Sequence, residues 1–355
     1  MMKDLYRQLQ ERLDQYSMGF PATESGVEIE ILKELFSEED ADLFLKLTPK
    51  LETPEEVAQR LERPTDAMAD QLDYMAERGL LFRLRKGDRA KYGAIPFVHG
   101  LFEFQVSRLD QRLAQLLEKY MEEGFHGAIT RGAAAFLRTV PVQRTVEVLH
   151  NVAPYEDASV IIRKASKIVV TDCICRKQKR LVGQGCDAPL EACFMFGSMG
   201  QYYVDRGMGR EVDTEEAIRI LKEAQDAGLV TQPATAQNPG GMCNCCGDCC
   251  GVLSSLKRYP KPAEKVFSNY VARVNDDLCS GCETCTDRCQ MDAIKMSPAG
   301  TAWINLDRCI GCGLCVATCP EDALELVLKP EDQRRTPPAT ALDQMVFMAE
   351  TRRAA

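Results

Sequence analysis

Two stretches near the C-terminus decide how this chain folds: CSGCETCTDRC at residues 279–289 and CIGCGLCVATC at residues 309–319. Both follow the spacing C-x2-C-x2-C-x3-C, and the second begins 30 residues after the first. The eight positions are Cys279, Cys282, Cys285, Cys289, Cys309, Cys312, Cys315 and Cys319. A duplicated spacing of this kind predicts a two-fold internal repeat that gathers thiolates around metal.

Three thiolates on a tight loop suit three irons of a cubane cluster, so the fourth ligand has to come from another part of the chain. Gly281 and Gly311 stand where backbone would fold closely over an inorganic core and aim its amides at sulfur. We expect a short helical stretch after each run, at residues 291–294 and 321–324.

The two runs resemble the bacterial dicluster ferredoxin family over roughly a sixth of the chain. The resemblance implies two 4Fe-4S clusters between two βαβ-like halves. It assigns Cys279, Cys282, Cys285 and Cys319 to one cluster, and Cys309, Cys312, Cys315 and Cys289 to the other. Gln290 departs from the family, which usually has proline after the fourth cysteine of the first run. Proline there shapes a turn, so the departure concerns local geometry and not cluster binding. The alternative, two zinc sites on these cysteines, fits poorly because zinc ribbons rarely use three cysteines in one seven-residue run.

Composition points to metal and not to disulfides. The chain has 355 residues, a formal charge of −9, and 17 cysteines against three histidines. Disulfides suit small secreted domains, whereas this long chain shows no secretory signal and no apolar run of membrane-spanning length. These features predict a soluble, cytoplasmic protein. The acidic charge argues against nucleic acid or an anionic membrane as the partner and favours a protein.

Nine further cysteines lie in the middle of the chain and are candidate metal ligands. They are Cys173, Cys175, Cys186, Cys193, Cys243, Cys245, Cys246, Cys249 and Cys250. A third iron-sulfur cluster, a structural zinc and reactive thiols are the alternatives, because spacing does not choose between them. The doublets Cys245-Cys246 and Cys249-Cys250, each followed by glycine, resemble the CCG motif of heterodisulfide reductase subunits, although the remaining spacing fits that family poorly.

Several local patterns around these cysteines predict secondary structure. A β-branched run at Ile168 precedes the first pair and indicates a strand, and the residues after Asp213 indicate a helix that ends at Gly228. Basic residues directly follow Cys175: Arg176, Lys177, Lys179 and Arg180. They either stabilise a reduced cluster and dock an acidic carrier, or form a solvated surface.

The N-terminal half has no cysteine, and residues 37–95 resemble a winged-helix domain: two short helices, a longer helix that Thr65 would cap, and a hairpin turning at residues 86–88. Its third helix carries Asp66, Asp70, Asp73 and Glu77, which would repel DNA phosphates. The basic residues left for phosphate contact are Arg83, Arg85, Lys86, Arg89 and Lys91. Protein docking is therefore favoured over DNA binding. Residues 97–120 predict one further amphipathic helix.

Together these patterns predict an α+β multidomain protein. We expect a winged-helix-like domain at residues 1–125, a cysteine-rich α/β metal-binding domain at 126–266, a dicluster ferredoxin domain at 267–330 and a tail at 331–355. The expected role is relaying low-potential electrons to or from a partner oxidoreductase in anaerobic metabolism. Two alternatives are an oxidoreductase whose catalytic metal centre lies on the middle cysteines, and a redox-sensing winged-helix regulator that binds DNA.

Overall fold

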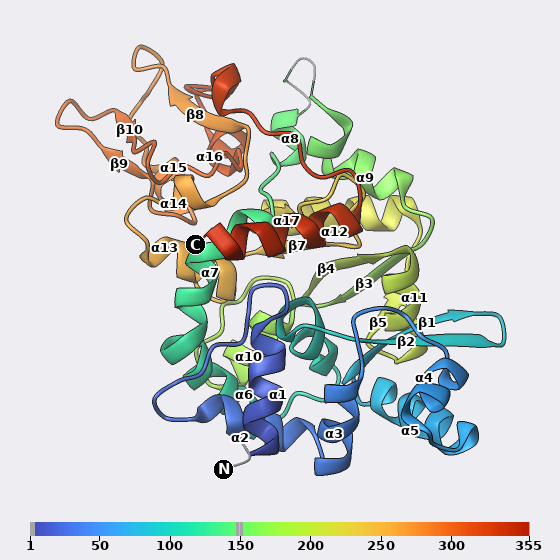
Figure 1. Cartoon of the computed structure of the whole chain (residues 1–355). Helices are drawn as coiled ribbons and strands as arrows, with labels where there is room; N and C mark the ends of the chain where they lie inside the picture. Colours follow the sequence, from blue (N-terminus) through green and yellow to red (C-terminus); the bar gives the residue numbers. More distant parts are fainter. Residues whose placement is uncertain (1–3, 147–148, 150–151, 355) are drawn as a thin grey trace.

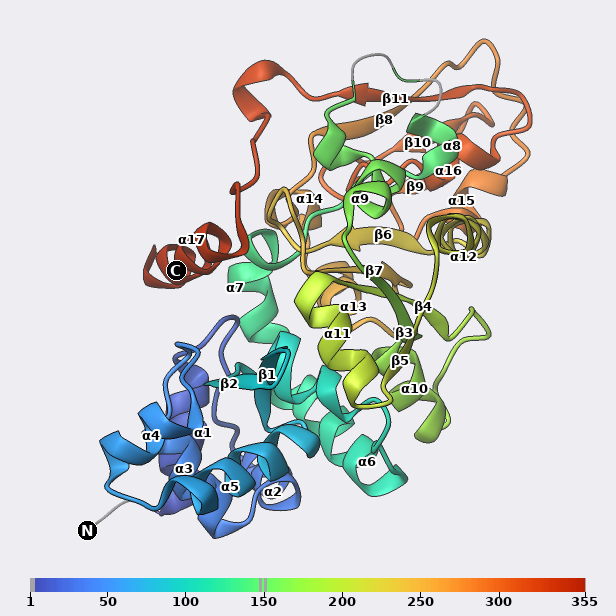
Figure 2. The same cartoon turned by 90° about the vertical axis from the view of Figure 1, so that its right-hand side faces the viewer.

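The protein has three regions, arranged in chain order from one end of the molecule to the other. A computed structural model describes residues 4–146, 149 and 152–354. The N-terminal helices and a hairpin form one end, a five-stranded sheet lies in the middle, and the segment with the two cysteine runs forms the opposite end (Figures 1 and 2). The expected mixed α+β architecture is confirmed.

The N-terminal region has the predicted order of helices followed by a hairpin. Its elements are α1 (Leu5–Asp14), α2 (Val27–Leu35), α3 (Glu38–Lys46), α4 (Pro54–Leu61), α5 (Thr65–Glu77), β1 (Leu81–Lys86) and β2 (Arg89–Ala94). Thr65 is the first residue of α5 and not its cap, because Pro64 holds the cap position. Arg83 is not available for phosphate contact, since it is buried and pairs with Asp73 at 2.9 Å. The winged-helix assignment stays a prediction.

The single helix predicted over residues 97–120 is wrong. An irregular turn at Phe97–Leu101 and a short turn at Glu103–Gln105 come first, and α6 covers only Gln111–Tyr120. The chain breaks at His99, whose φ of 57° lies in the left-handed region. A new helix then begins because the Asp110 side chain accepts a hydrogen bond from the Leu113 amide at 2.8 Å. The chain continues through Met121–Phe125 into α7 (His126–Phe136).

The middle region is built on a sheet with the order β5-β3-β4-β7-β6, in which every neighbouring pair is antiparallel. The predicted α/β class is therefore corrected to α+β. The strands are β3 (Ile168–Asp172), β4 (Glu191–Phe196), β5 (Gly209–Glu211), β6 (Val230–Pro233) and β7 (Gly241–Cys245). The helices are α8 (Gln143–Val146), α9 (Ala158–Lys164), α10 (Ile174–Leu181), α11 (Gly197–Asp205), α12 (Thr214–Asp226), α13 (Gly251–Arg258) and α14 (Pro262–Lys265). The strand predicted at Ile168 and the helix predicted after Asp213 are confirmed.

The C-terminal region repeats strand, helix and strand twice. The elements are β8 (Tyr270–Val274), α15 (Thr284–Arg288), β9 (Ile294–Met296), β10 (Ala302–Ile304), α16 (Leu314–Thr318) and β11 (Leu324–Leu328). β8 pairs with β11 and β9 pairs with β10, so the outer strands of the two halves join. The short helices predicted after each run are wrong: α15 and α16 lie within the runs. The chain leaves each run through a turn at Asp292 or Asp322, both with positive φ.

The last helix, α17 (Ala341–Ala354), folds back on the molecule and packs on α7. One continuous buried apolar cluster includes Leu9, Phe44, Tyr202 and Leu253, and it extends to Leu314 beside the second cysteine run. The domain boundaries drawn from sequence stay predictions. Among the described residues, the longest apolar helices fall short of what crossing a membrane requires.

Candidate metal centres

The structure brings the eight cysteines of the two runs together in two sets. Cys279, Cys282, Cys285 and Cys319 line one cavity, although Cys319 belongs to the second run. Cys312, Cys309 and Cys289 have the largest thiol effects on the pKa of Cys315, ahead of Cys285, although Cys289 belongs to the first run. Each set thus contains three cysteines of one run and the last cysteine of the other.

Backbone amides point at the sulfurs of these sets in a symmetric way. The Ala302 amide on β10 donates to Cys279 Sγ at 3.3 Å, and the Ala272 amide on β8 donates to Cys309 Sγ at 3.4 Å. The two donors, Ala302 and Ala272, are 30 positions apart, and so are the two acceptors, Cys279 and Cys309. Amide donors of this kind stabilise the negative charge of a thiolate-bound cluster. The residues present therefore fit an anionic metal-sulfur centre in each half.

The two loop glycines are required by close packing of backbone on backbone. Gly281 and Gly311 have φ of 72° and 68°. A Cβ on Gly311 would lie 2.2 Å from the carbonyl oxygen of Tyr270, and one on Gly281 would lie 2.4 Å from that of Gly300. No other residue type fits either position without moving a strand or turn that faces the cluster loop.

The two sets differ in their surroundings. Cys282 is exposed to solvent, whereas Cys312 packs against the main core. The Cys312 carbonyl accepts a hydrogen bond from the Val142 amide at 3.0 Å, and the next carbonyl accepts one from the Thr145 hydroxyl at 3.1 Å. Burial raises the pKa of Cys312 to about 12. One set therefore opens to solvent, and the other faces the middle region.

Comparison with protein families supports this geometry. Residues 272–326 match the family described as 4Fe-4S dicluster domain. This dicluster domain binds two 4Fe-4S clusters, which makes the chain an iron-sulfur protein of the electron-transfer kind. A search of curated proteins gave no match. The functions of the other two regions must therefore be argued from their own residues.

The nine middle cysteines separate into two groups. Six of them line one cavity of about 60 Å³ between β3, β4, β7 and the starts of α10 and α13: Cys173, Cys175, Cys193, Cys243, Cys245 and Cys250. Each of these thiols interacts with two others, so that they form a closed ring in the order 173, 175, 250, 245, 243, 193. We call this arrangement the six-cysteine ring.

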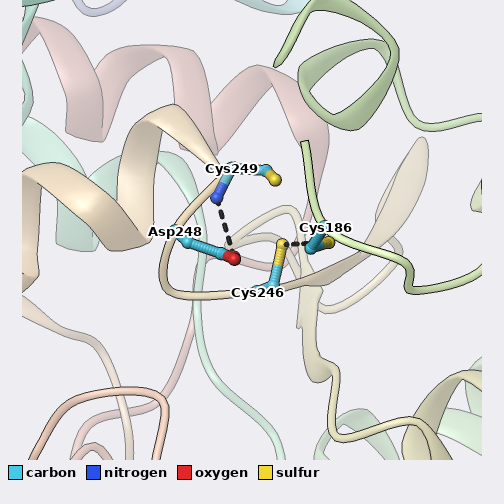
Figure 3. A group of neighbouring side chains, drawn as sticks. All are labelled: Cys186, Cys246, Asp248 and Cys249. Atoms are coloured by element: carbon cyan, nitrogen blue, oxygen red, sulfur yellow. Dashed lines mark hydrogen bonds between the residues drawn. The ribbon is translucent and has the colours of Figure 1, made fainter. Parts of the chain in front are cut away.

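The second group lies on the other side of the doublets. Cys186, Cys246, Cys249 and Asp248 place their ligand atoms within 4.8 Å of one another (Figure 3). The Cys186 and Cys246 sulfurs are 3.7 Å apart. Two thiolates on one tetrahedral metal with bonds of about 2.3 Å are separated by about 3.8 Å, so this spacing fits a single metal ion. We call this arrangement the Asp248 group.

Local chain geometry explains the separation. Cys243 and Cys245 are two residues apart on β7, and therefore point to the same face of the sheet. Each doublet contributes one member to each group: Cys245 and Cys250 to the ring, Cys246 and Cys249 to the Asp248 group. The doublets thus form the boundary between two sites, which is why neither the CCG resemblance nor the spacing predicted the arrangement.

A buried cation, Arg176, lies beside the ring. Arg176 is 0% exposed, and the charges of Cys173, Cys193 and Cys245 raise its pKa, although burial opposes the shift. Its Nη1 donates to the Asn244 carbonyl at 2.9 Å, while Nε and Nη2 have no hydrogen-bond partner in the part of the chain that the structure describes. Two unpaired guanidinium donors beside six thiols fit a site that holds acceptors such as cluster sulfides. Of the basic residues after Cys175, Arg176 is therefore not part of a solvated surface.

Gln290, the residue that departs from the ferredoxin family, joins the dicluster domain to the doublets. Its Oε1 accepts a hydrogen bond from the Gly247 amide at 2.6 Å, and its Nε2 donates to the Gly228 carbonyl at 3.0 Å. A Cβ on Gly247 would lie 2.3 Å from the Gln290 carbonyl oxygen, so the two loops touch closely. A proline could supply neither side-chain bond.

Two residues at the ring, His99 and Glu103, were not predicted from the sequence. His99 forms a hydrogen bond with Cys243 and is half-buried, and Glu103 lines the same cavity. The Gly100 amide donates to Glu103 Oε2 at 3.0 Å. The only sequence signal was a lone histidine beside glycine, inside a stretch that was predicted to be helical. Spacing alone did not connect it to Cys243, which lies 144 residues further along the chain.

Proposed function

We propose that this protein takes up low-potential electrons at the dicluster domain and passes them to a metal-sulfur centre on the middle cysteines. The coarser part of this function, iron-sulfur electron transfer, follows from the dicluster domain. The finer part rests chiefly on one observation: Gln290, adjacent to a ligand of one cluster, hydrogen-bonds to Gly247, adjacent to Cys246. The dicluster domain and the doublets are thereby in direct contact.

The two sets of the dicluster domain would act in series. We assign the cluster ligands as the resemblance implies, Cys279, Cys282, Cys285 and Cys319 for the outer cluster, and Cys309, Cys312, Cys315 and Cys289 for the inner one. The exposed position of Cys282 suits uptake from an external redox protein. The inner set packs against the middle region and leads through Cys289 and Gln290 to Gly247.

The two middle groups would have different tasks. The Asp248 group suits a single ion, such as zinc, because its four ligand atoms are close together and one is a carboxylate oxygen. The six-cysteine ring suits a polynuclear iron-sulfur centre, because all six donors are sulfur and Arg176 balances negative charge beside them. A cluster there would supply the redox chemistry, and the protein would exclude water and fix the donors.

This arrangement favours the oxidoreductase alternative over a simple carrier. A carrier needs no enclosed centre behind its two clusters, whereas an enzyme needs a protected place for chemistry. The DNA-binding alternative gains nothing from the structure, since Arg83 is buried and the β1–β2 hairpin packs on α11 of the middle region.

Metal analysis tests the proposal. Iron, acid-labile sulfide and zinc are measured per chain on anaerobically purified protein, together with the EPR spectrum after dithionite reduction. We expect twelve or more irons, on the order of eight in the dicluster domain plus at least four in the ring, and about one zinc. Replacing Cys243 and Cys245 by alanine should remove only the iron above eight. About eight irons in the unmodified protein would contradict a redox centre in the ring.

A further inference from the structure

A second, larger cavity adjoins the six-cysteine ring. It has a volume of about 460 Å³, a size typical of sites for small organic ligands. The two cavities share part of their lining: His99, Glu103, Phe136, Met195, Tyr203 and Cys243. We call the larger one the apolar cavity. The shared lining contains one cysteine of the ring, Cys243. Besides Cys243 and Tyr203, its ionisable side chains are those of His99 and Glu103.

The walls of the apolar cavity are mainly hydrophobic and come from the N-terminal region, the middle region and α17. Phe82 and Phe104 belong to the N-terminal region, Met195 and Met199 to the middle region, and Met345 and Met348 to α17. Flexible methionines beside rigid aromatic rings make a wall that adapts to apolar ligands. Water would form few hydrogen bonds in this cavity, since few polar groups line it.

The polar end of the cavity is held by strained backbone. His99 adopts a left-handed conformation that costs a residue other than glycine about 1 kcal/mol or more. The His99 ring packs on Phe136 with centroids 4.3 Å apart, and it contacts Cys243. Glu103 is fixed by the Gly100 amide. The strained backbone of His99 and the hydrogen bond to Glu103 thus place one imidazole and one carboxyl group where the apolar cavity meets the ring.

We propose that the apolar cavity is the substrate site of this protein, and that it binds a small, mainly apolar organic molecule whose polar group lies against His99 and Glu103 beside the ring. The inference rests on the proposed function, because it takes the ring to be the redox centre. It adds the class of molecule on which that centre acts. A bound molecule would be enclosed by apolar walls and would lie within electron-transfer range of Cys243, as an oxidoreductase requires.

A variant that closes the cavity from the solvent side provides a direct test. Ala349 is exposed on α17 and lines the apolar cavity, whereas Val346 is exposed on the same helix but does not line it. Ala349→Trp should therefore block the cavity, and Val346→Trp is its matched control. Met199→Trp fills the cavity from within, and Met199→Leu is the control of similar volume.

The probe is 2-naphthol, an apolar ring system with one hydroxyl group, and its binding to anaerobic, fully metallated protein is followed by fluorescence. We expect one molecule per chain, and at least tenfold weaker binding in Ala349→Trp or in Met199→Trp, with unchanged affinity in both controls. Iron content is measured for every variant, so that a folding defect is recognised. Equal affinity in all variants, or no binding to the unmodified protein, would overturn the proposal.

The EPR spectrum tests whether the bound probe lies beside the ring. Saturating 2-naphthol should change the EPR spectrum that disappears in the Cys243→Ala, Cys245→Ala variant, and should leave the dicluster signals unchanged. A spectrum insensitive to the probe would overturn the placement. These outcomes are separate from those of the metal analysis: twelve irons without binding of 2-naphthol would reject only the substrate site, whereas eight irons would reject the ring as a redox centre.

Discussion

At the scale of single residues, charge inside the middle region is the feature with the clearest consequence. Arg176 is a buried cation with two unpaired donors among the described contacts, and four cysteines of the two middle groups act on its charge. A positive charge near a reducible centre favours the state with the extra electron. Arg176 should therefore set the reduction potential of the ring more than any other cation of α10.

Substituting Arg176→Met should lower the reduction potential of the ring centre by roughly 100 mV, equivalent to about 2 kcal/mol for one electron, as expected for a charge about 8 Å away at an effective dielectric near 20. An EPR-monitored redox titration measures the shift. Lys177→Met is the matched control, because Lys177 lies on the same helix but donates to the Val106 carbonyl at 2.8 Å. Equal potentials in the two variants would argue against a redox centre beside Arg176.

The titration of Glu103 gives a second prediction at this scale, because burial raises the pKa of its carboxyl group from 4.5 to about 7. The folded state therefore holds a proton that the unfolded state releases above pH 4.5, and the stability from this carboxyl group is fully present below that pH. It is lost as the pH rises through about 7, by about 3 kcal/mol.

Glu103→Gln removes this titration. Between pH 5 and pH 8, the thermal midpoint of the unmodified, fully metallated protein should fall by roughly 5 °C relative to that of the variant. Parallel midpoints across this range would show that Glu103 is ionised in the folded protein at pH 5 or remains neutral at pH 8.

At the scale of secondary-structure elements, one contact between the dicluster domain and the middle region joins the loop after α15 to the loop after β7 and to the C-terminal end of α12. Gln290 forms two hydrogen bonds across this contact, and Arg288 adds one to the Gln225 carbonyl at 3.0 Å. The contact is polar and specific, since two glycines, Gly228 and Gly247, allow the side chain to approach backbone.

Gln290→Ala should destabilise the fully metallated protein by about 1–3 kcal/mol. This is the usual cost of losing two hydrogen bonds when their partly buried partners are left unpaired. Electron transfer from the dicluster domain to the ring should also become slower, while the iron content stays the same. Rapid-mixing spectroscopy measures the rate, and Gln333→Ala, at an exposed position, is the control. Unchanged transfer in Gln290→Ala would place the electron path elsewhere.

Elements also show what could be predicted from sequence and what could not. The repeated cysteine spacing was sufficient for the dicluster domain, because three ligands lie on one loop and local chain geometry dictates their contact. The separation of the middle cysteines was not predictable, since it depends on β7 alternation and on how β3, β4 and α13 meet. His99 was missed for a related reason: a left-handed residue broke a pattern with helical periodicity.

At the scale of the whole molecule, the three regions form a sequence of environments. The outer cysteine set opens to solvent, the inner set packs on the core, and the six-cysteine ring is enclosed between the N-terminal and middle regions. The N-terminal region and α17 cover the apolar cavity. The N-terminal region therefore contributes walls to the apolar cavity.

Transfer of electrons through the dicluster domain to the ring is the central claim, and rapid freeze-quench EPR tests it most directly. Anaerobic protein is mixed with a reduced low-potential ferredoxin, and the ring signal is followed in time. In Cys282→Ala, the ring should be reduced at least tenfold more slowly than in the control Asp276→Asn, at an exposed position of the same domain, because the outer cluster is lost. Reduction of the ring at the same rate in both variants would contradict the account.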